Sequence, residues 1–235
     1  MMPPTHAMPL PRQDARALSG PVPARPPWVD LDRIAKRHFL QRRGVRRKQP
    51  LFHAGQPCRT LYLVQAGCFK TIILSEDGRE KITGFHLRGD LLGVDSLDLP
   101  VYACDAVALD TSDVWELPVS ILMDQYTGML PQVTATLAAE VRREWHWMLA
   151  LGTLGAEQRV AAFLLDFAAR LAAMGYSGHH LLLRMTRADL GNYLALQLET
   201  VTRALTRLSV QGLIVVAGRE IHIVDMAGLR HLLYR

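Results

Sequence analysis

The pattern that most constrains the fold lies between positions 186 and 213, where apolar residues recur at helical spacing on both sides of a short break. It predicts a short helix, a tight turn and a second helix that begins at Leu198 or Glu199. Each helix has one core-facing apolar stripe, formed by Leu190, Leu194, Val201, Leu205 and Leu208. This arrangement is typical of a helix-turn-helix, whose second helix presents its N-terminal end to the major groove of DNA.

The outer face of the predicted second helix carries side chains that can read bases. Arg203 lies one turn beyond Glu199, and its planar guanidinium can grip guanine O6 and N7. Glu199 can accept from cytosine N4 and orient Arg203, or the two can form only a surface pair. Thr202 would contact a thymine methyl group or a base edge. The candidate DNA-binding residues are Glu199, Thr202, Arg203, Arg207, Thr186 and Arg187.

Composition allows this interpretation and narrows the compartment. The 235 residues, 49% of them hydrophobic, can form two domains or one large one, and the net charge is +5. Three widely spaced cysteines favour a reducing cytoplasm. No apolar run approaches the ~20 residues of a membrane span, so we expect a cytoplasmic protein without a membrane partner. Positions 1–30 are proline-rich and predict a disordered leader.

A cluster of basic residues between positions 31 and 50 has two interpretations. Asp32 is the single acidic residue between positions 31 and 50. It could neutralise DNA phosphates, or it could be an ordinary solvated surface. Its members are Arg33, Lys36, Arg37, Arg42, Arg43, Arg46, Arg47 and Lys48.

Short apolar segments separated by turn residues predict a β domain in the first half. Strands are expected over 60–64, 69–74 and 81–85, with at least one more over 107–117 that Pro118 ends. This spacing is typical of a small antiparallel sandwich or barrel. In the second half, helix 157–174, a strand over 181–185 and a hairpin of 214–216 with 220–224 would complete a winged helix.

A long helix between these halves, from 131 to about 151, carries a coiled-coil seam. Apolar residues follow heptad-like spacing, interrupted by Thr134 and Glu144, which predicts a parallel homodimer. The candidate dimerisation residues are Leu137, Val141, Glu144, Met148 and Leu151, with Leu130 at the start of the seam. Facing its own copy, Glu144 would have a raised pKa and tune the monomer–dimer balance. Alternatively it swings to solvent or pairs with Arg143 of the partner subunit.

Five runs resemble the CRP/FNR superfamily of bacterial transcription regulators, and its FNR branch most closely. They are QPLF at 49–52, ITGFHL at 82–87, GDLLG at 89–93, VAAF at 160–163 and MTRADLGNYL at 185–194. The resemblance implies an α+β fold with an N-terminal antiparallel β-roll or jelly roll of the cyclic-nucleotide-binding type, a long dimerisation helix and a C-terminal winged helix-turn-helix. The implied boundaries are a leader at 1–30, a sensory domain at 31–127, the dimerisation helix at 128–152 and a DNA-binding domain at 153–235.

The same resemblance implies a non-enzymatic regulator that binds double-stranded DNA as a homodimer. Leu198 is apolar where CRP-like proteins carry arginine, which implies an inverted repeat of TTGAT-like half-sites. Thr202 replaces the serine of FNR-like proteins and keeps its hydroxyl group. Glu144 matches an acidic position of their dimerisation helix. RNA polymerase would be a further partner of an activator.

The sensory half departs from the family in its ligand residues. No cysteine precedes Cys58, and Trp115 stands where the family places its barrel cysteine, so we expect no iron–sulfur cluster. Segment 93–104 contains no arginine, and Asp95 and Asp98 would repel a phosphate, so we expect no cyclic AMP. No other metal site is expected.

Three means of sensing stay open: a heme on a histidine, a thiol switch, or no ligand. The first two would make the chain a heme- or thiol-based sensor of redox state or nitric oxide in the same family. The candidate residues are His53, His86, His146, Cys58, Cys68 and Cys104. A cupin-like metalloenzyme is disfavoured, because His53 and His86 are isolated in the barrel. A ligand-binding module whose helix-turn-helix contacts protein is the third class considered.

Overall fold

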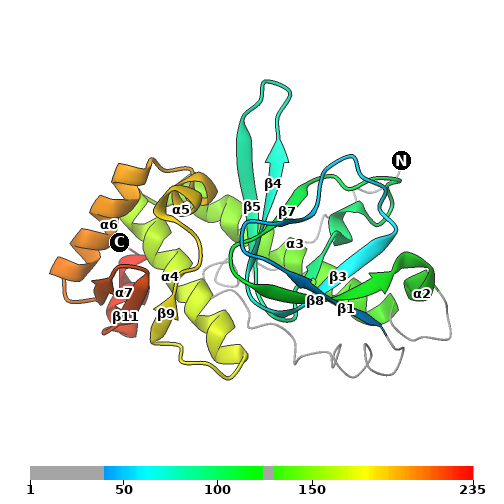
Figure 1. Cartoon of the computed structure of the whole chain (residues 1–235). Helices are drawn as coiled ribbons and strands as arrows, with labels where there is room; N and C mark the ends of the chain where they lie inside the picture. The colour runs from blue at the N-terminus through cyan, green and yellow to red at the C-terminus, as the bar shows by residue number, and fades with distance from the viewer. Residues whose placement is uncertain (1–39, 124–129, 235) are drawn as a thin grey trace, which may run out of the picture.

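The computed structural model of the chain describes residues 40–123 and 130–234. The predicted leader and the basic residues Arg33, Lys36 and Arg37 lie outside the described residues. The first described part is a β-roll built from two four-stranded antiparallel sheets (Figure 1). One sheet has the order β1 (Gln41–Val45), β8 (Ser112–Pro118), β3 (Thr60–Ala66), β6 (Leu91–Leu92). The other has the order β2 (Pro50–Phe52), β7 (Asp105–Ala108), β4 (Phe69–Leu74), β5 (Glu80–His86).

The predicted strands of the roll are confirmed in kind. Segment 107–117, where at least one strand is expected, contains parts of two, β7 and β8, which belong to different sheets. The chain crosses between the sheets at 109–111, where Ser112 Oγ donates to the Asp110 carbonyl and Thr111 N donates to the Asp110 carboxylate. The polar stretch from Asp110 to Asp113 marks this crossing in the sequence, because it separates the apolar residues of the two strands.

Strand β3 is buried on both faces, which explains why its sequence shows no alternation. Tyr62 and Val64 point into the core between the two sheets. Leu61 and Leu63 point to the opposite face. There they meet Leu122 of α2 (Val119–Met123) and the start of the long helix. Pleated strands direct successive side chains to opposite faces, so this sheet is the middle layer of a three-layer packing.

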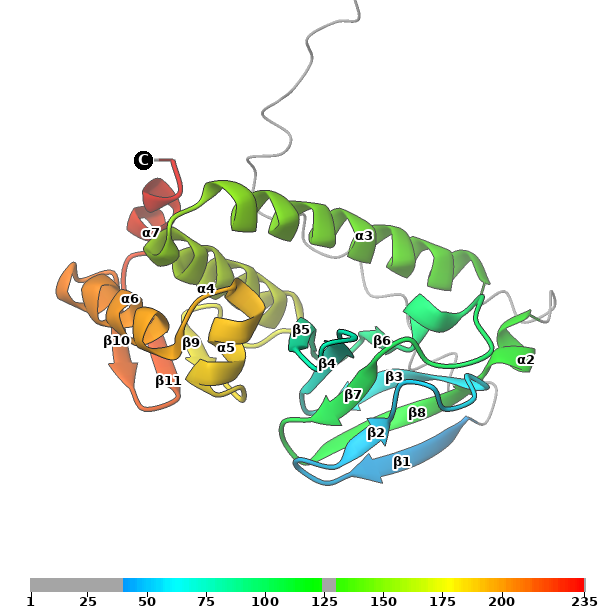
Figure 2. The ribbon, with the colours of Figure 1, turned by 90° about the horizontal axis from the view of Figure 1, so that it is seen from above.

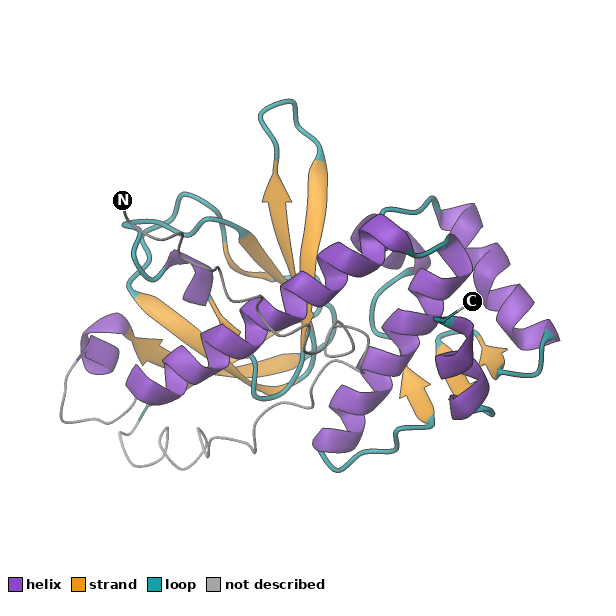
Figure 3. Ribbon diagram, turned by 180° about the vertical axis from the view of Figure 1, so that it is seen from behind, coloured by secondary structure: helices purple, strands orange, loops and turns teal. Residues whose placement is uncertain are grey.

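The long helix predicted between the two halves is confirmed as α3 (Leu130–Thr153). Its 24 residues span about 36 Å at the usual rise per residue. Figure 2 shows it running along the roll and ending beside the C-terminal domain, and Figure 3 shows it crossing the roll from behind. A short 3-10 turn, η2 (Val94–Ser96), follows β6 in the roll.

The second described part, here called the reader domain, is a winged helix. Helix α4 ends before Gly175, whose φ of 82° requires a left-handed backbone. The small sheet has the order β10-β11-β9. The strand expected over 181–185 is shorter, because residues 183–185 leave the sheet toward the helix-turn-helix. The elements are α4 (Ala156–Ala173), β9 (His180–Leu182), α5 (Arg187–Leu194), α6 (Leu198–Val210), β10 (Ile214–Ala217), β11 (Glu220–Ile223) and α7 (Met226–Leu232).

The roll and the reader domain share one hydrophobic core. Ile82, Phe85 and Leu87 of the roll belong to the same buried cluster as the interior of the winged helix. Trp147 of α3 joins them at 5% exposure. The two domains are therefore packed against each other by buried apolar surface, which favours one fixed arrangement. No helix among the described residues has the length and apolar character needed to cross a membrane.

Candidate nucleic-acid interface

The helix-turn-helix is held by local contacts that its sequence encodes. Thr186 caps α5 by accepting from the Asp189 backbone at 3.0 Å, and the Asp189 carboxylate accepts from the Thr186 backbone at 2.9 Å. The turn passes so close to α5 that a Cβ on Gly191 would lie 2.6 Å from the Leu196 carbonyl oxygen. Ala195 completes the turn with a φ of 53°.

The predicted core stripe of this motif is confirmed. Helix α6 begins at Leu198, as expected, and its polar face is left outside. The apolar residues named from spacing are all buried, with exposures of 3% or less: Leu190, Leu194, Val201, Leu205 and Leu208. Their burial fixes the rotation of α6 about its axis, so the residues between them must face outward.

The outward face of α6 is an open polar surface. Glu199, Arg203 and Arg207 are exposed, and Thr202 is half-buried. No ion pair joins Glu199 to Arg203 within the described part of the chain. Thr202 donates to the Leu198 carbonyl at 3.0 Å and receives a 3.4 Å hydrogen bond from the Arg187 guanidinium. The side chains needed for base contacts are thus available to a partner.

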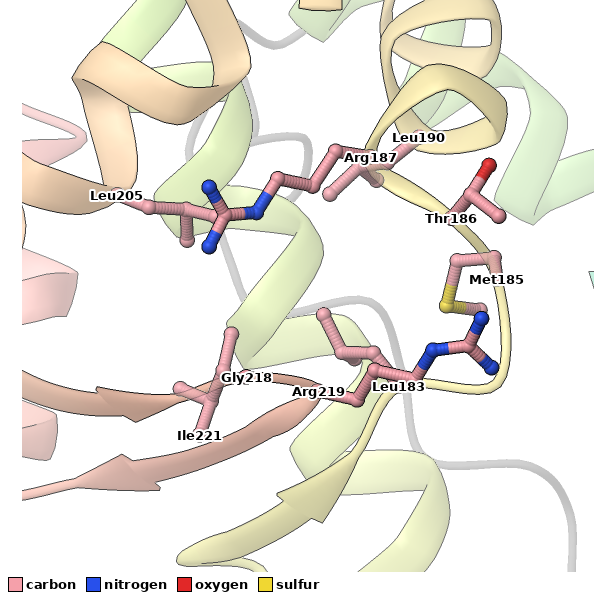
Figure 4. A pocket seen from close by; sticks show the side chains of 9 residues that line it. All are labelled: Leu183, Met185, Thr186, Arg187, Leu190, Leu205, Gly218, Arg219 and Ile221. Carbon is pink, nitrogen blue, oxygen red and sulfur yellow. The ribbon is translucent and has the colours of Figure 1, made fainter.

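The structure adds an arginine that the sequence analysis did not name as a DNA contact. A cavity of about 230 Å³ lies between α5, α6 and the wing. Figure 4 shows Arg187 on its α5 side and Arg219 on its wing side. Arg219 follows Gly218 in the β10–β11 turn and is exposed. The sequence signal that could have identified Arg219 is its place in the tight hairpin turn, since a basic residue at the tip of a wing lies beside the helix that enters the groove.

The basic cluster of the first strand is only partly free. Arg42 pairs with Asp113 at 2.6 Å, and Arg43 lies 3.7 Å from Glu116. Arg46, Arg47 and Lys48 are exposed. Because Asp113 and Glu116 neutralise two arginines of the cluster, the structure favours its interpretation as an ordinary solvated surface.

Segment 93–104, which would hold a nucleotide phosphate, contributes Tyr102 to the wall of a cavity of about 460 Å³ that Arg43 and Arg59 also line. Tyr102 stacks on Phe52 with ring centroids 3.9 Å apart, and its hydroxyl donates to the Thr60 carbonyl. Ser96 is fully buried and accepts from the Ala103 backbone at 2.9 Å. Burial raises the pKa of Tyr102. This side chain is a packed, neutral phenol and supplies no positive charge.

The three cysteine thiols lie in surroundings that disfavour the thiolate. Burial raises the pKa of Cys68 to about 12. Burial also raises the pKa of Cys104, and nearby Asp95 adds to the shift. For Cys58 burial is again the larger cause and Asp95 the smaller. Since the thiolate is the reactive form, these positions are typical of packed rather than reactive cysteines.

The three candidate heme histidines occupy unrelated places. His53 lies 3.3 Å from the Asp105 carboxylate at the surface of the roll. His86 Nε2 and Thr71 Oγ1 are 3.0 Å apart, and His146 Nδ1 lies 2.7 Å from the Arg142 carbonyl on α3. Within residues 40–123 and 130–234, no group of three or more His, Cys, Asp or Glu side chains is arranged to hold a metal ion.

The seam face of α3 is uncovered in the single chain. Val141 is 41% exposed and Met148 is 70% exposed. Trp147, next to the seam residue Met148 in the sequence, is buried in the core shared by the two domains. Leu137 and Leu151 are half-buried, and Glu144 is exposed.

The neighbours of Glu144 revise one expected contact. Arg143 is buried and bonds to Glu140 of its own helix at 2.7 Å, which disfavours the alternative in which Glu144 pairs with Arg143 of the partner subunit. The pKa of Glu144 is raised, first by desolvation of its carboxyl group beside the neighbouring side chains, which Arg143 opposes, and then by Glu140 and Asp166. This shift is present before any second carboxylate approaches.

Comparisons with known proteins agree with this geometry. Residues 158–232 match the Crp-like helix-turn-helix domain, and residues 42–126 match the cyclic nucleotide-binding domain. The chain is 39% identical to the anaerobic regulatory protein of Pasteurella multocida, over 86% of this chain and 74% of that one. It is 38% identical to the transcriptional activator protein anr of Pseudomonas aeruginosa, over 83% of this chain and 80% of that one.

A solved structure shows the same fold. FixK2 from Bradyrhizobium japonicum superposes with a TM-score of 0.73 at 32% identity, covering 82% of this chain and 96% of that chain. The order of roll, long helix and winged helix is the α+β architecture expected from the sequence. With relatives of this identity along most of both chains, the protein belongs to the CRP/FNR family of DNA-binding transcription regulators, which are not enzymes.

Proposed function

We propose that the protein is a homodimer that reads an inverted repeat with TTGAT-like half-sites. The observation that carries this proposal is the open face of α6, where Glu199, Thr202 and Arg203 project from a rigidly packed helix. Arg203 would form the bidentate contact with guanine, and Glu199 would accept from cytosine. Two readers related by a twofold axis would enter major grooves about 34 Å apart, which matches a palindrome.

Basic and hydroxyl residues around that face would hold the DNA backbone. Arg187 lies beside Thr202, while Arg219 extends from the wing on the other side of the cavity between them. Thr186 and Arg207 are exposed at the two ends of the surface. Contacts of this kind set the register of the protein on the duplex and carry no base information.

The test is a titration in air of the purified protein against a labelled TTGAT–ATCAA duplex and a scrambled duplex. Arg203→Ala is expected to lose about 1–3 kcal/mol on the palindrome and little on the scrambled duplex. Arg230→Ala is the matched control, since Arg230 is an exposed arginine on α7, away from the α6 face. Equal losses on both duplexes would make Arg203 a phosphate contact and sink the base-reading role.

We further propose that the seam of α3 forms the dimer and that Glu144 sets its strength. Leu137, Val141, Met148 and Leu151 supply apolar surface on one side of a continuous helix, the geometry of a coiled coil. A second Glu144 across the seam would raise an already raised pKa, so Glu144→Ala should tighten the dimer. Analytical ultracentrifugation measures this, and an unchanged dissociation constant in the variant would refute the tuning role.

We propose that regulation uses neither an iron–sulfur cluster nor cyclic AMP. A cluster needs about four thiolates. Cys68 and Cys104 are buried, and burial disfavours the thiolate at all three cysteines. Tyr102 occupies space in the nucleotide segment without offering a charge for phosphate. Iron and acid-labile sulfide in anaerobically purified protein would overturn the first point, and a saturable calorimetric signal with cyclic AMP the second.

The names of relatives suggest two further features. The Pasteurella multocida protein is an anaerobic regulator and the Pseudomonas aeruginosa protein an activator. An activating role here would make RNA polymerase a partner. Heme and thiol sensing are the competing proposal for the stimulus; an absorption spectrum of the purified protein tests heme, and the raised thiol pKa values disfavour the thiol switch.

A further inference from the structure

The first helix of the helix-turn-helix completes a sheet of the roll. Strand β5 is the edge of its sheet, so alternate backbone groups along it have no strand partner. The Asn192 side chain supplies that partner: its Nδ2 donates to the Glu80 carbonyl at 2.9 Å and its Oδ1 accepts from the Ile82 backbone at 2.7 Å. A single carboxamide thus imitates the pairing of an additional strand, using one donor and one acceptor.

Two lysines from the same β hairpin hold opposite ends of α5. Lys81 on β5 donates to the carbonyls of Asn192 and Tyr193, at 2.5 and 3.0 Å, in the last turn of the helix. The Asn192 carbonyl also accepts from the Ala195 backbone at 3.3 Å, and the C-terminal end of a helix attracts positive charge. Lys70 on β4 bonds to Asp189 in the first turn at 2.6 Å. We call Lys70, Lys81, Asp189 and Asn192 the latch.

Aromatic packing lies beneath these polar contacts. The ring of Tyr193 meets Phe85 of the roll at 5.2 Å and Trp147 of α3 at 5.1 Å, both in edge-to-face geometry. Figure 1 and Figure 2 both show α5 beside β5, where the hairpin passes between roll and reader domain. The latch therefore joins α5 to the roll, and Tyr193 joins α5 to α3.

The docked surface of α5 is not the surface that would meet DNA. Asp189, Asn192 and Tyr193 face the hairpin. Arg187 turns instead toward Thr202 of α6. With the latch closed, Glu199 and Arg203 remain exposed, so docking leaves the reading face uncovered.

We propose that Lys70, Lys81, Asp189 and Asn192 are positioning residues for DNA reading. They hold α5, and with it α6, at one angle to the roll and to α3. A palindrome requires both readers at fixed positions, and a protein already held in its binding arrangement loses less freedom when it binds. The latch residues touch no DNA and act through the orientation of α6. This inference depends on the family's DNA binding and not on the TTGAT half-site.

The experiment combines binding with a distance measurement. The duplex is the one that the native protein selects from a random pool, so the result is independent of the half-site proposed above. Spin labels at Glu76→Cys on the hairpin tip and Val210→Cys at the end of α6, in a Cys58→Ser background, report the angle between roll and reader. Labelled chains are diluted with unlabelled chains, so that distances arise within one protomer.

Asn192→Ala is expected to broaden the distance distribution and to weaken DNA binding about tenfold, as when only a tenth of the molecules hold the competent arrangement. Lys81→Met, which keeps the apolar stem, should act in the same direction, and Lys81→Arg should restore both readouts. Gln211→Ala is the matched control, because it removes an amide that bonds only within the reader domain, to Glu157. Circular dichroism melting establishes that each variant is folded.

Three results would overturn the proposal. An unchanged distance distribution in folded Asn192→Ala and Lys81→Met would mean that the latch does not set the orientation. A broadened distribution with native affinity would mean that orientation does not limit binding. Tighter binding by the variants would show that the latch restrains the reader in an unproductive arrangement.

Discussion

Helices α5 and α6 each carry a polar face, but the two faces differ in whether their side chains bond within the chain. On α5, Asp189 and Asn192 are bonded to the roll, so their hydrogen-bonding capacity is used within the chain. On α6, Glu199 and Arg203 project into solvent. A polar group that its own chain satisfies contributes to position, whereas an exposed one keeps its capacity for a partner. Polar side chains therefore serve structure on one helix and are left available for a partner on the next.

The largest expected effect comes from removing another polar side chain that is bonded within the chain, at the contact between the reader domain and the roll. Arg170 of α4 donates to the Phe85 carbonyl at 2.9 Å and to Asp90 at 2.6 Å, joining reader domain and roll. Arg170→Met leaves the buried Asp90 carboxylate without this cation, and we expect a loss of about 3–5 kcal/mol in the free energy of unfolding. Urea denaturation measures it. Arg230→Ala, on the exposed surface, should stay within about 0.5 kcal/mol, and a similar small change in Arg170→Met would contradict the interpretation.

A smaller effect is expected where α5 meets the turn. Gly191→Ala places a methyl group 2.6 Å from the Leu196 carbonyl oxygen, so the turn must shift. Overpacking of this kind costs about 1–3 kcal/mol. The matched control is Gly152→Ala near the end of α3, where a Cβ meets nothing within 4 Å and helix propensity favours alanine. Thermal melting should separate the two variants in opposite directions.

The smallest effect concerns acid. Burial alone would raise the pKa of Asp189, but hydrogen bonds from Lys70 and Thr186 outweigh it and hold the pKa below its ordinary value of 3.8. The unfolded chain then binds the proton more readily, so this contribution to stability is complete above the unfolded pKa and is lost as pH falls through the folded one. The gap in unfolding free energy between native protein and Asp189→Asn should close in that acid range.

Asp225→Asn provides the comparison for this pH series, because the Asp225 carboxylate caps α7 within the reader domain by accepting from the Gly228 backbone at 2.8 Å. If the difference in unfolding free energy between native protein and Asp189→Asn stays unchanged through the acid range, ionisation of the Asp189 carboxylate does not contribute to the stability of the latch.

Local patterns in the sequence predicted the reader domain well. Leu190, Val201 and Leu205 alternate with polar residues at helical spacing, and each is buried as that spacing requires. Thr186 and Asp189 form a capping pair, and a stretch of only four residues in the sequence is enough to recognise it. The open face of α6 follows from the same periodicity, since a helix that buries one stripe must expose the other.

Contacts between distant segments could not be predicted in this way. Lys70 and Asp189 are 119 positions apart, and nothing local to either residue names its partner. Trp147 lies beside seam residues in sequence, yet it packs into the interdomain core, because the helix face it occupies is set by the neighbouring domain. Arg143 is buried for the same reason. The latch and the shared core both depend on three-dimensional assembly.

The Asn192 contact with β5 also protects the molecule from self-association. An uncovered sheet edge is a template on which another chain can add a strand, and this is a common origin of aggregation. Asn192 bonds to the Glu80 and Ile82 backbone groups in the first half of β5. If α5 moved away from the roll, those groups would be presented to neighbouring molecules. The contact that we propose to orient the reader domain would thus also oppose aggregation, and selection against aggregation would preserve it independently of DNA.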